Sequence, residues 1–130
     1  MPFVAKHPEH YVGQEVGEGR HKGQCVSYVR AVTKLPQTSL WIEGVPVWDC
    51  DNLALGTAVA TFDANGCYGN KTDGSSHACI FIEHDAHTGG FWAYDQWLNH
   101  PVARRLIRPK GGAGQACDDA DQYSVVEVAA

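Results

Sequence analysis

The sequence is poor in the features that mark several common classes of protein. No apolar run approaches the roughly 18 residues that a membrane-spanning helix needs, and no internal repeat or low-complexity tract occurs. The chain has 10 lysines and arginines against 15 aspartates and glutamates, so its formal net charge is −5. A surface that coats nucleic acid is normally basic. We therefore expect neither membrane insertion nor nucleic-acid binding.

Several chemical motifs are also missing. No C-x-x-C pair occurs, so a zinc ribbon or finger is not expected. His84 and His87 lie close together but lack a third firm ligand, and we expect no metal site and no cofactor. The chain has no G-x-S-x-G motif and no phosphate-binding loop, so serine hydrolysis and nucleotide hydrolysis have no support.

The composition favours one folded domain. The chain has 130 residues, of which 44% are hydrophobic and 19% are charged, and this length suits a single domain, 1–130, with its own core. Residues 1–20 are polar and contain several glycines, so we interpret them as a lead-in segment. They show no apolar core typical of a secretion signal. We expect synthesis in the cytoplasm and export by a route that reads no cleavable signal.

The spacing of apolar residues changes along the chain. From Gln24 to about Lys34 it is helical, and Pro36 follows as a stop signal. Residues 35–52 are interpreted as a loop region with short pieces of structure. Alternating or β-branched patterns then predict strands within 56–63, 77–85, 90–98, 102–110 and 123–128. A helix followed by sequential strands predicts an α+β fold with a mostly antiparallel sheet against which the helix packs.

The position of Cys25 suits a nucleophile. It stands in the first turn of the predicted helix, where unpaired backbone N–H groups carry partial positive charge. That charge lowers the pKa of a thiol, and the same N–H groups can hold an oxyanion. Gly23 permits a sharp turn into the helix and leaves room for a substrate backbone. Packing of Cys25 in the core is the alternative.

Two further residues complete a possible catalytic set. His77 begins the strand 77–85 and shares one face with Cys79 and Phe81, and we expect the helix to lie on that face. Asp95 lies on the next strand, roughly opposite residues 79–81. A carboxylate there can accept a hydrogen bond from the imidazole and stabilise its charged form. Cysteine, histidine and aspartate on three adjoining elements predict a cysteine hydrolase.

Other features allow two interpretations each. The basic run Arg104, Arg105, Arg108 and Lys110 is interpreted as the solvated face of a strand, or as a site for substrate carboxylates. Alternation places Arg105 on the face opposite Arg104. The remaining cysteines either stay free and buried or form at least one disulfide, and the sequence does not select among the pairings of Cys50, Cys67, Cys79 and Cys117.

Three stretches resemble a known family. "GQCVSYV" at residues 23–29 resembles the cysteine motif of the CHAP amidases, the cysteine, histidine-dependent amidohydrolases/peptidases. "SHACIFI" at 76–82 resembles their histidine motif, and "YDQW" at 94–97 resembles the acid-then-tryptophan stretch of the next strand. The layout over residues 13–128 looks most like the small papain-like amidase effectors of type VI secretion.

The resemblance implies a papain-like (CHAP/NlpC-like) fold and a set of roles. Cys25 would be the nucleophile, His77 the general base and acid, and Asp95 the residue that orients His77. The candidates for substrate contacts are Gln24, Tyr28 and Trp97. Val26 stands where threonine is usual, and Asp95 stands where Glu or Asn is common, so the subfamily and the bond cut stay open.

The resemblance also implies a biological setting. It predicts cleavage of an amide bond in the peptide part of peptidoglycan, in the periplasm or cell wall of a target bacterium, and a cognate immunity protein in the producing cell. A phage-type lysin would use the same chemistry. A non-catalytic binding module on the same scaffold and a disulfide-stapled secreted protein with Cys25 bridged are the alternatives from other classes.

Overall fold

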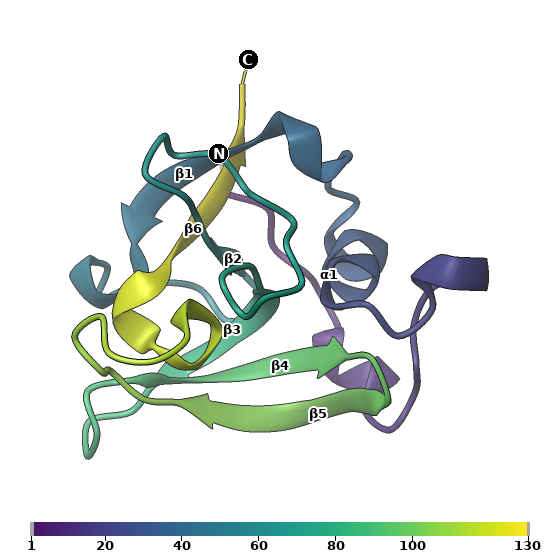
Figure 1. The fold of residues 1–130 in the computed structure, drawn as a ribbon. Coiled ribbons are helices and arrows are strands. Elements are labelled where there is room, and N and C mark those ends of the chain that lie inside the picture. Colours follow the sequence, from purple (N-terminus) through teal and green to yellow (C-terminus); the bar gives the residue numbers. More distant parts are fainter. Residues whose placement is uncertain (1, 130) are drawn as a thin grey trace.

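A computed structural model describes residues 2–129, which contain one α-helix, α1, six strands and several short 3-10 turns (Figure 1). The helix spans Cys25–Thr33. The strands are β1 (Trp41–Pro46), β2 (Ala58–Thr61), β3 (Ala78–His84), β4 (Phe91–Trp97), β5 (His100–Ile107) and β6 (Tyr123–Val128). They form one antiparallel sheet in the order β1-β6-β2-β3-β4-β5. The predicted α+β class is confirmed.

Helix α1 begins and ends close to the predicted residues. Gly23 has φ +85°, a conformation that glycine adopts without strain, and the helix starts two residues later at Cys25. The helix ends where Lys34 takes the left-handed conformation, with its N–H donating to the Arg30 carbonyl. Pro36 therefore lies beyond a helix that has already ended.

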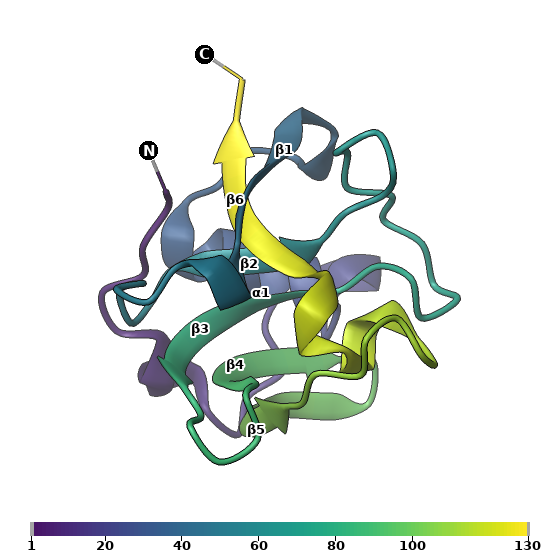
Figure 2. The ribbon, with the colours of Figure 1, turned by 90° about the vertical axis from the view of Figure 1, so that its left-hand side faces the viewer.

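The two faces of the sheet carry different layers (Figure 2). Tyr28 and Val29 of α1 share a core cluster with residues of one face, among them Ala58, Ala60 and Ala78. Three alanines at this surface let the helix approach the sheet closely. The other face carries a second cluster, formed by Cys79, Phe81, Phe91, Ala120 and Tyr123 among others. The 3-10 turn Ala120–Gln122, which leads into β6, covers this side.

The arrangement corrects one expectation about the helix. We expected α1 to lie on the face of Cys79 and Phe81, but these side chains belong to the cluster on the opposite face. Their neighbours Ala78 and Ile80 point toward α1 instead. His77 lies one residue before β3 begins, so it approaches Cys25 from just before the first residue of the strand.

Strand β1 was not predicted, because its residues fall in the segment 35–52 interpreted as loop. Gly44 and Pro46 disfavour a strand by propensity. The strand forms because β6 pairs with it, joining Trp41 to Val128. Gly44 is required there, since a Cβ at this position would lie 2.8 Å from the Val125 carbonyl oxygen.

The lead-in segment is bonded to the rest of the fold. Val4 forms an isolated β-bridge with Thr57, and the buried Tyr28 hydroxyl donates to the Pro8 carbonyl at 2.8 Å. Val16 is held by the side chain of Gln96 on β4. Among residues 2–129, no helix has both the length and the apolarity needed to span a bilayer.

Candidate active site

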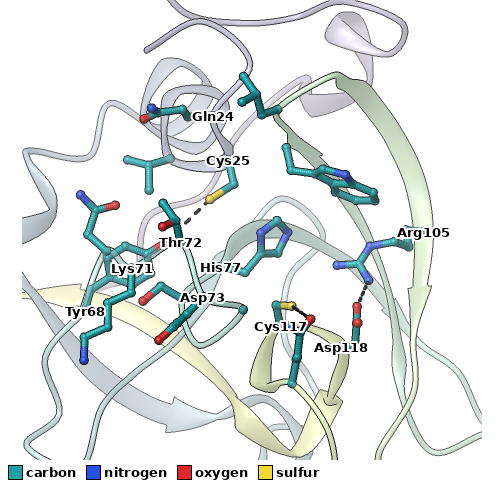
Figure 3. Close-up of a pocket in the computed structure, with 17 residues that line it drawn as sticks. Gln24, Cys25, Tyr68, Lys71, Thr72, Asp73, His77, Arg105, Cys117 and Asp118 are labelled. Carbon is teal, nitrogen blue, oxygen red and sulfur yellow. Dashed lines mark hydrogen bonds and ion pairs between the residues drawn. The ribbon is translucent and has the colours of Figure 1, made fainter. Parts of the chain in front are cut away.

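A pocket of about 800 Å³ opens at the N-terminal end of α1 (Figure 3). One wall consists of Cys25 and its neighbours, the start of β3, and the hairpin between β4 and β5. The opposite wall consists of residues from the loop 69–76 and of Gln115, Cys117 and Asp118. The lining side chains that bear on the chemistry are Cys25, Tyr68, Lys71, Asp73, His77, Trp97, Arg105 and Asp118.

Cys25 occupies the first position of α1, where the helix dipole favours a thiolate. Its Sγ lies 3.8 Å from the Tyr68 hydroxyl oxygen. Burial by itself would raise the pKa of the Cys25 thiol, but a hydrogen bond to His77, the charge of the imidazolium and the backbone of Ala78 outweigh it. The net result is a pKa below the ordinary value for cysteine, as a nucleophile requires.

His77 and Asp95 form a buried pair. The Nε2 atom of His77 lies 2.8 Å from Oδ2 of Asp95, and the two residues are 6% and 0% exposed. Burial by itself would lower the pKa of His77, but hydrogen bonds to Asp95 and Cys25 raise it to about 9. Burial alone would raise the Asp95 pKa, yet His77 and Arg105 hold it below its ordinary value. The imidazole and the carboxylate are therefore both charged near neutral pH.

The backbone of His77 is fixed by β2. Its N–H donates to Thr61 Oγ1 at 3.0 Å, and its carbonyl accepts from the Thr61 N–H at 3.0 Å. The β3–β4 register pairs Ile80 with Tyr94, which places Asp95 across from Cys79, inside the predicted range of 79–81. The hairpin thus brings the carboxylate to the imidazole as the sequence predicted.

The electrostatics favour an ion pair between sulfur and imidazole. The thiolate forms above the lowered pKa of Cys25, and the imidazolium persists up to about pH 9. Between these limits a nucleophile and a proton donor coexist in one pocket. The arrangement can therefore attack a carbonyl carbon and protonate a leaving amine.

Gln96 is a buried residue of the site that sequence reasoning missed. Its Nε2 donates to the carbonyls of Gln24, at 2.7 Å, and of Val16, at 2.8 Å, while its Oε1 accepts from the Val16 N–H. The side chain thereby joins the residue before Cys25 to the strand that carries Asp95. A buried polar residue next to a candidate catalytic acid is the signal that could have identified it.

The basic run was interpreted as the solvated face of a strand, with Arg105 placed by alternation on the face opposite Arg104, and the structure does place the two side chains on opposite faces. The Nη2 of Arg105 lies 2.7 Å from Asp95 Oδ2, and its Nη1 donates to Asp118 Oδ1 at 3.1 Å. The alternation of side chains along a strand, which separates Arg105 from Arg104, was the sequence signal for this difference. Arg104 does remain on the exposed face, where it pairs with Glu83 and stacks over Trp92.

The candidate substrate residues divide into two groups. Gln24 and Trp97 line the pocket, although the Gln24 amide donates back to the Arg20 carbonyl. Trp97 stacks on His100 and meets the His77 ring edge to face. Tyr28 is 0% exposed and belongs to the core cluster under α1. A substrate cannot reach it, so the prediction of a substrate contact at Tyr28 is wrong.

The structure shows neither a disulfide nor a group of possible metal ligands among the described residues that would alter the chemistry of Cys25. All five cysteines are free, so the arrangement with a bridged Cys25 is absent from this structure. Within residues 2–129, one group of possible metal ligands occurs, His7, Glu9 and His10, all exposed and outside the pocket. The two imidazoles stack with 5° between their planes. Lone pairs lie in the ring planes, and nearly parallel planes do not meet at one ion.

The fold and the site together define a papain-like hydrolase: a cysteine at the start of a helix faces a histidine supplied by an antiparallel sheet. The comparisons with known proteins give the family. The chain belongs to the domesticated amidase effector 2 family, whose model matches residues 2–126.

The relatives cover nearly the whole chain. The type VI secretion amidase effector 2 protein of Salmonella typhi is 32% identical over 139 residues, covering 98% of this chain and 100% of that protein. Domesticated amidase effector 2 of Ixodes scapularis is 34% identical over 114 residues, covering 85% of this chain and 75% of that protein. A solved structure of type 6 secretion amidase effector 2 superposes with a TM-score of 0.80 at 28% identity, covering 98% of this chain and 96% of that one.

These relations confirm the predicted kinship with the small amidase effectors of type VI secretion, and with it the predicted amidase class. The papain-like fold class is confirmed as well.

Proposed function

We propose that the chain is a cysteine amidase that cleaves an amide bond in the peptide part of peptidoglycan and acts as an antibacterial type VI secretion effector. The observation that carries the proposal is the buried hydrogen bond between His77 and Asp95, beside a thiol of lowered pKa at the start of α1. The family membership supports the same chemistry. The site belongs to one domain that includes the lead-in segment.

The reaction is acyl transfer in two halves. The Cys25 thiolate attacks the amide carbonyl carbon, and the backbone N–H of Cys25 with a neighbouring donor stabilises the oxyanion. The His77 imidazolium gives its proton to the leaving amine as the C–N bond breaks, which leaves a thioester on Cys25. His77 then takes a proton from water, whose oxygen attacks the thioester. Collapse of that intermediate releases the acid and restores the thiolate–imidazolium pair.

The pocket suits a peptide that bears charges of both signs. Lys71 and Arg105 place cationic groups along it, and Asp73 and Asp118 place carboxylates. The peptides of peptidoglycan carry free carboxylates and, where diaminopimelate is present, an amine. Trp97, which is 40% exposed at the rim, offers an apolar surface against which such a peptide can lie.

The finer parts of the proposal concern partners and place of action. An effector of this kind acts in the cell wall of a target bacterium, and its producer needs a cognate immunity protein. Such a protein would act most directly by covering the pocket around Cys25. The family membership favours this setting over a phage-type lysin, and the lowered thiol pKa favours an enzyme over a binding module.

The decisive experiment is digestion of purified Gram-negative sacculi, with soluble fragments identified by mass spectrometry. The wild type would be compared with Cys25→Ala and with Cys117→Ala, a matched control because Cys117 is also a free cysteine of the pocket. We expect new muropeptides from the wild type and Cys117→Ala only, and their masses identify the bond. Equal release by Cys25→Ala would contradict the proposal.

A further inference from the structure

We propose that Arg105 is a positioning residue, which holds the Asp95 carboxylate against His77 and links that pair to Asp118 at the rim of the pocket. The activity changes expected for Arg105 variants rest on the proposed function. The contacts among Asp118, Arg105, Asp95 and His77 can be tested without substrate.

The contacts of Asp95 are concentrated on a single oxygen. His77 Nε2 at 2.8 Å, Arg105 Nε at 2.9 Å and Arg105 Nη2 at 2.7 Å all approach Oδ2. The other oxygen, Oδ1, is buried and has no hydrogen-bond partner among the described residues. Nothing on the Oδ1 side therefore holds the carboxylate, so its orientation depends on the two side chains at Oδ2, His77 and Arg105. Without Arg105, only His77 would hold it.

Arg105 is itself fixed from the far side. Its Nη1 donates to Asp118 Oδ1 at 3.1 Å, and its guanidinium lies 5.3 Å from the centre of the Trp97 ring. Asp118 keeps 49% of its side chain exposed, whereas Asp95 is fully buried. A continuous series of contacts therefore runs from Asp118 at the pocket rim, through Arg105 and Asp95, to His77.

The charges of Cys25, His77, Asp95 and Arg105 also support a positioning role for Arg105. With the ion pair formed, Cys25 and Asp95 are negative, and His77 and Arg105 are positive. Removing Arg105 would leave one net negative charge among groups that are largely withdrawn from water, and an unbalanced buried charge is strongly unfavourable. Arg105 thus allows a thiolate and a carboxylate to exist together at either side of one imidazole.

The titratable groups around Asp95 determine how a titration of His77 is interpreted. They are His77 before β3, Tyr28 on α1, Cys79 on β3, Arg105 on β5 and Tyr123 on β6. Burial raises the pKa of Tyr28, of Cys79 and of Tyr123 above their ordinary values, so all three stay neutral near pH 7. Only His77 and Arg105 act on Asp95 as charges at that pH.

Positioning and simple competition predict opposite shifts. If Arg105 positions Asp95, its loss lets the carboxylate leave the imidazole, and the pKa of His77 falls from about 9. If Arg105 merely competes for Oδ2, or acts only as a positive charge near the imidazole, its loss strengthens the His77–Asp95 bond or removes a repulsion, and the pKa of His77 rises. The direction of the shift therefore separates the two roles.

The experiment uses the full chain with Arg105→Gln, and Arg104→Gln as the matched control. Arg104 is the adjacent residue of β5, but it pairs with Glu83 on the exposed face. The His77 imidazole would be titrated by NMR, with its resonance assigned by comparison with His77→Gln. Turnover of sacculi-derived muropeptides would be measured in parallel over the same pH range.

We expect Arg105→Gln to lower kcat about 10- to 100-fold with little change in KM, because a misplaced catalytic pair lowers the rate more than binding. The alkaline limb of the kcat profile and the His77 titration should both move to lower pH. Arg104→Gln should match the wild type. Arg105→Lys, which keeps the charge but not the forked donors, should recover part of the loss.

A folded Arg105→Gln with wild-type kcat, or with an unchanged or raised His77 titration, would overturn the proposal. If Arg105→Gln does not fold, Arg105→Lys carries the test, and a wild-type kcat and titration there would overturn it as well. If the wild type itself releases nothing from sacculi, the proposed function fails, while the titration still decides the role of Arg105.

Discussion

The two walls of the pocket differ in how they are held. On the wall of α1, β3 and β4, His77, Asp95 and Gln96 are buried, and each is bonded to at least two separate elements. On the opposite wall, the loop 69–76 is largely exposed, Gln115 is exposed, and Cys117 and Asp118 are half-buried. These two segments contact each other through the Cys117 N–H, which donates to the Gly74 carbonyl.

The difference separates two tasks within one site. Bond cleavage needs side chains held to a fraction of an ångström, which buried and multiply bonded residues provide. Substrate recognition tolerates more freedom, and we propose that it uses exposed charged groups of the pocket such as Lys71 and Asp73. Substitutions on the buried wall should therefore reduce kcat strongly, and substitutions on the loop wall should change KM weakly.

The largest effect is expected from His77→Gln. It removes the proton donor and leaves burial as the dominant influence on the Cys25 thiol, whose pKa then rises. Amidase activity should fall by about 10³-fold or more. The pH dependence of Cys25 alkylation by iodoacetamide, followed by mass spectrometry, checks the thiol directly. Alkylation that stays as fast at neutral pH as in the wild type would contradict this account.

Asp95→Asn should reduce kcat by about 10²- to 10⁴-fold, because an amide cannot stabilise the imidazolium as a carboxylate does. The wild type should show a bell-shaped kcat/KM profile. Its acid limb reports thiolate formation at the lowered pKa of Cys25, and its alkaline limb reports loss of the imidazolium near pH 9.

In Asp95→Asn the alkaline limb should move to lower pH, because a hydrogen bond that raises the His77 pKa is lost. An exposed acid, as in Asp121→Asn, serves as the control and should leave the profile unchanged. An alkaline limb that stays near pH 9 in Asp95→Asn would show that another group sets it.

Gln96→Leu should weaken both stability and catalysis. It leaves the backbone groups of Val16 and the carbonyl of Gln24 without their partner. Unmet hydrogen bonds of partly buried groups cost about 1 kcal/mol each, so for three such groups we expect about 3 kcal/mol of lost unfolding free energy. Urea denaturation measures this loss, and kcat should fall as the helix bearing Cys25 shifts. A Gln96→Leu variant as stable as the wild type would contradict the proposed contribution of these hydrogen bonds.

The smallest effect is expected on the loop wall. Lys71→Gln and Asp73→Asn remove exposed charges without disturbing buried contacts. We expect KM to change by about two- to fivefold and kcat to stay close to wild type, since exposed charge contacts are weak and screened by salt. Steady-state kinetics at low and high salt check this. A large loss of kcat in either variant would break the division between the two walls.

Much of the site could be predicted because it depends on local patterns. The helical spacing after Gly23 located Cys25 at a helix start, and the 77–85 and 90–98 patterns placed Asp95 on the strand beside His77. A short hairpin leaves few possible registers, so sequence distance nearly determines spatial distance. These are contacts between neighbours along the chain.

The features that the sequence analysis missed or misplaced depend instead on contacts between residues far apart in the chain. Strand β1 exists because β6 pairs with it from the far end of the chain, and propensity does not report such a partner. The face of the sheet that receives α1 depends on which layer of side chains leaves room, here the alanines of β2 and β3. Tyr28 lies in the core because α1 packs on that face of the sheet.

By itself, the amino-acid sequence determined the α+β class, the positions of the helix and most strands, and the neighbourhood of His77 and Asp95 that we propose as catalytic with Cys25, since periodicity and hairpin connections act over a few residues. Only the tertiary structure decided the roles of Gln96 and Arg105. Gln96 binds a backbone 80 residues away, and Arg105 reaches Asp95 across a strand pair and Asp118 in a later loop. A side chain's partners in such contacts are selected by the packing of the whole sheet, which no local pattern encodes.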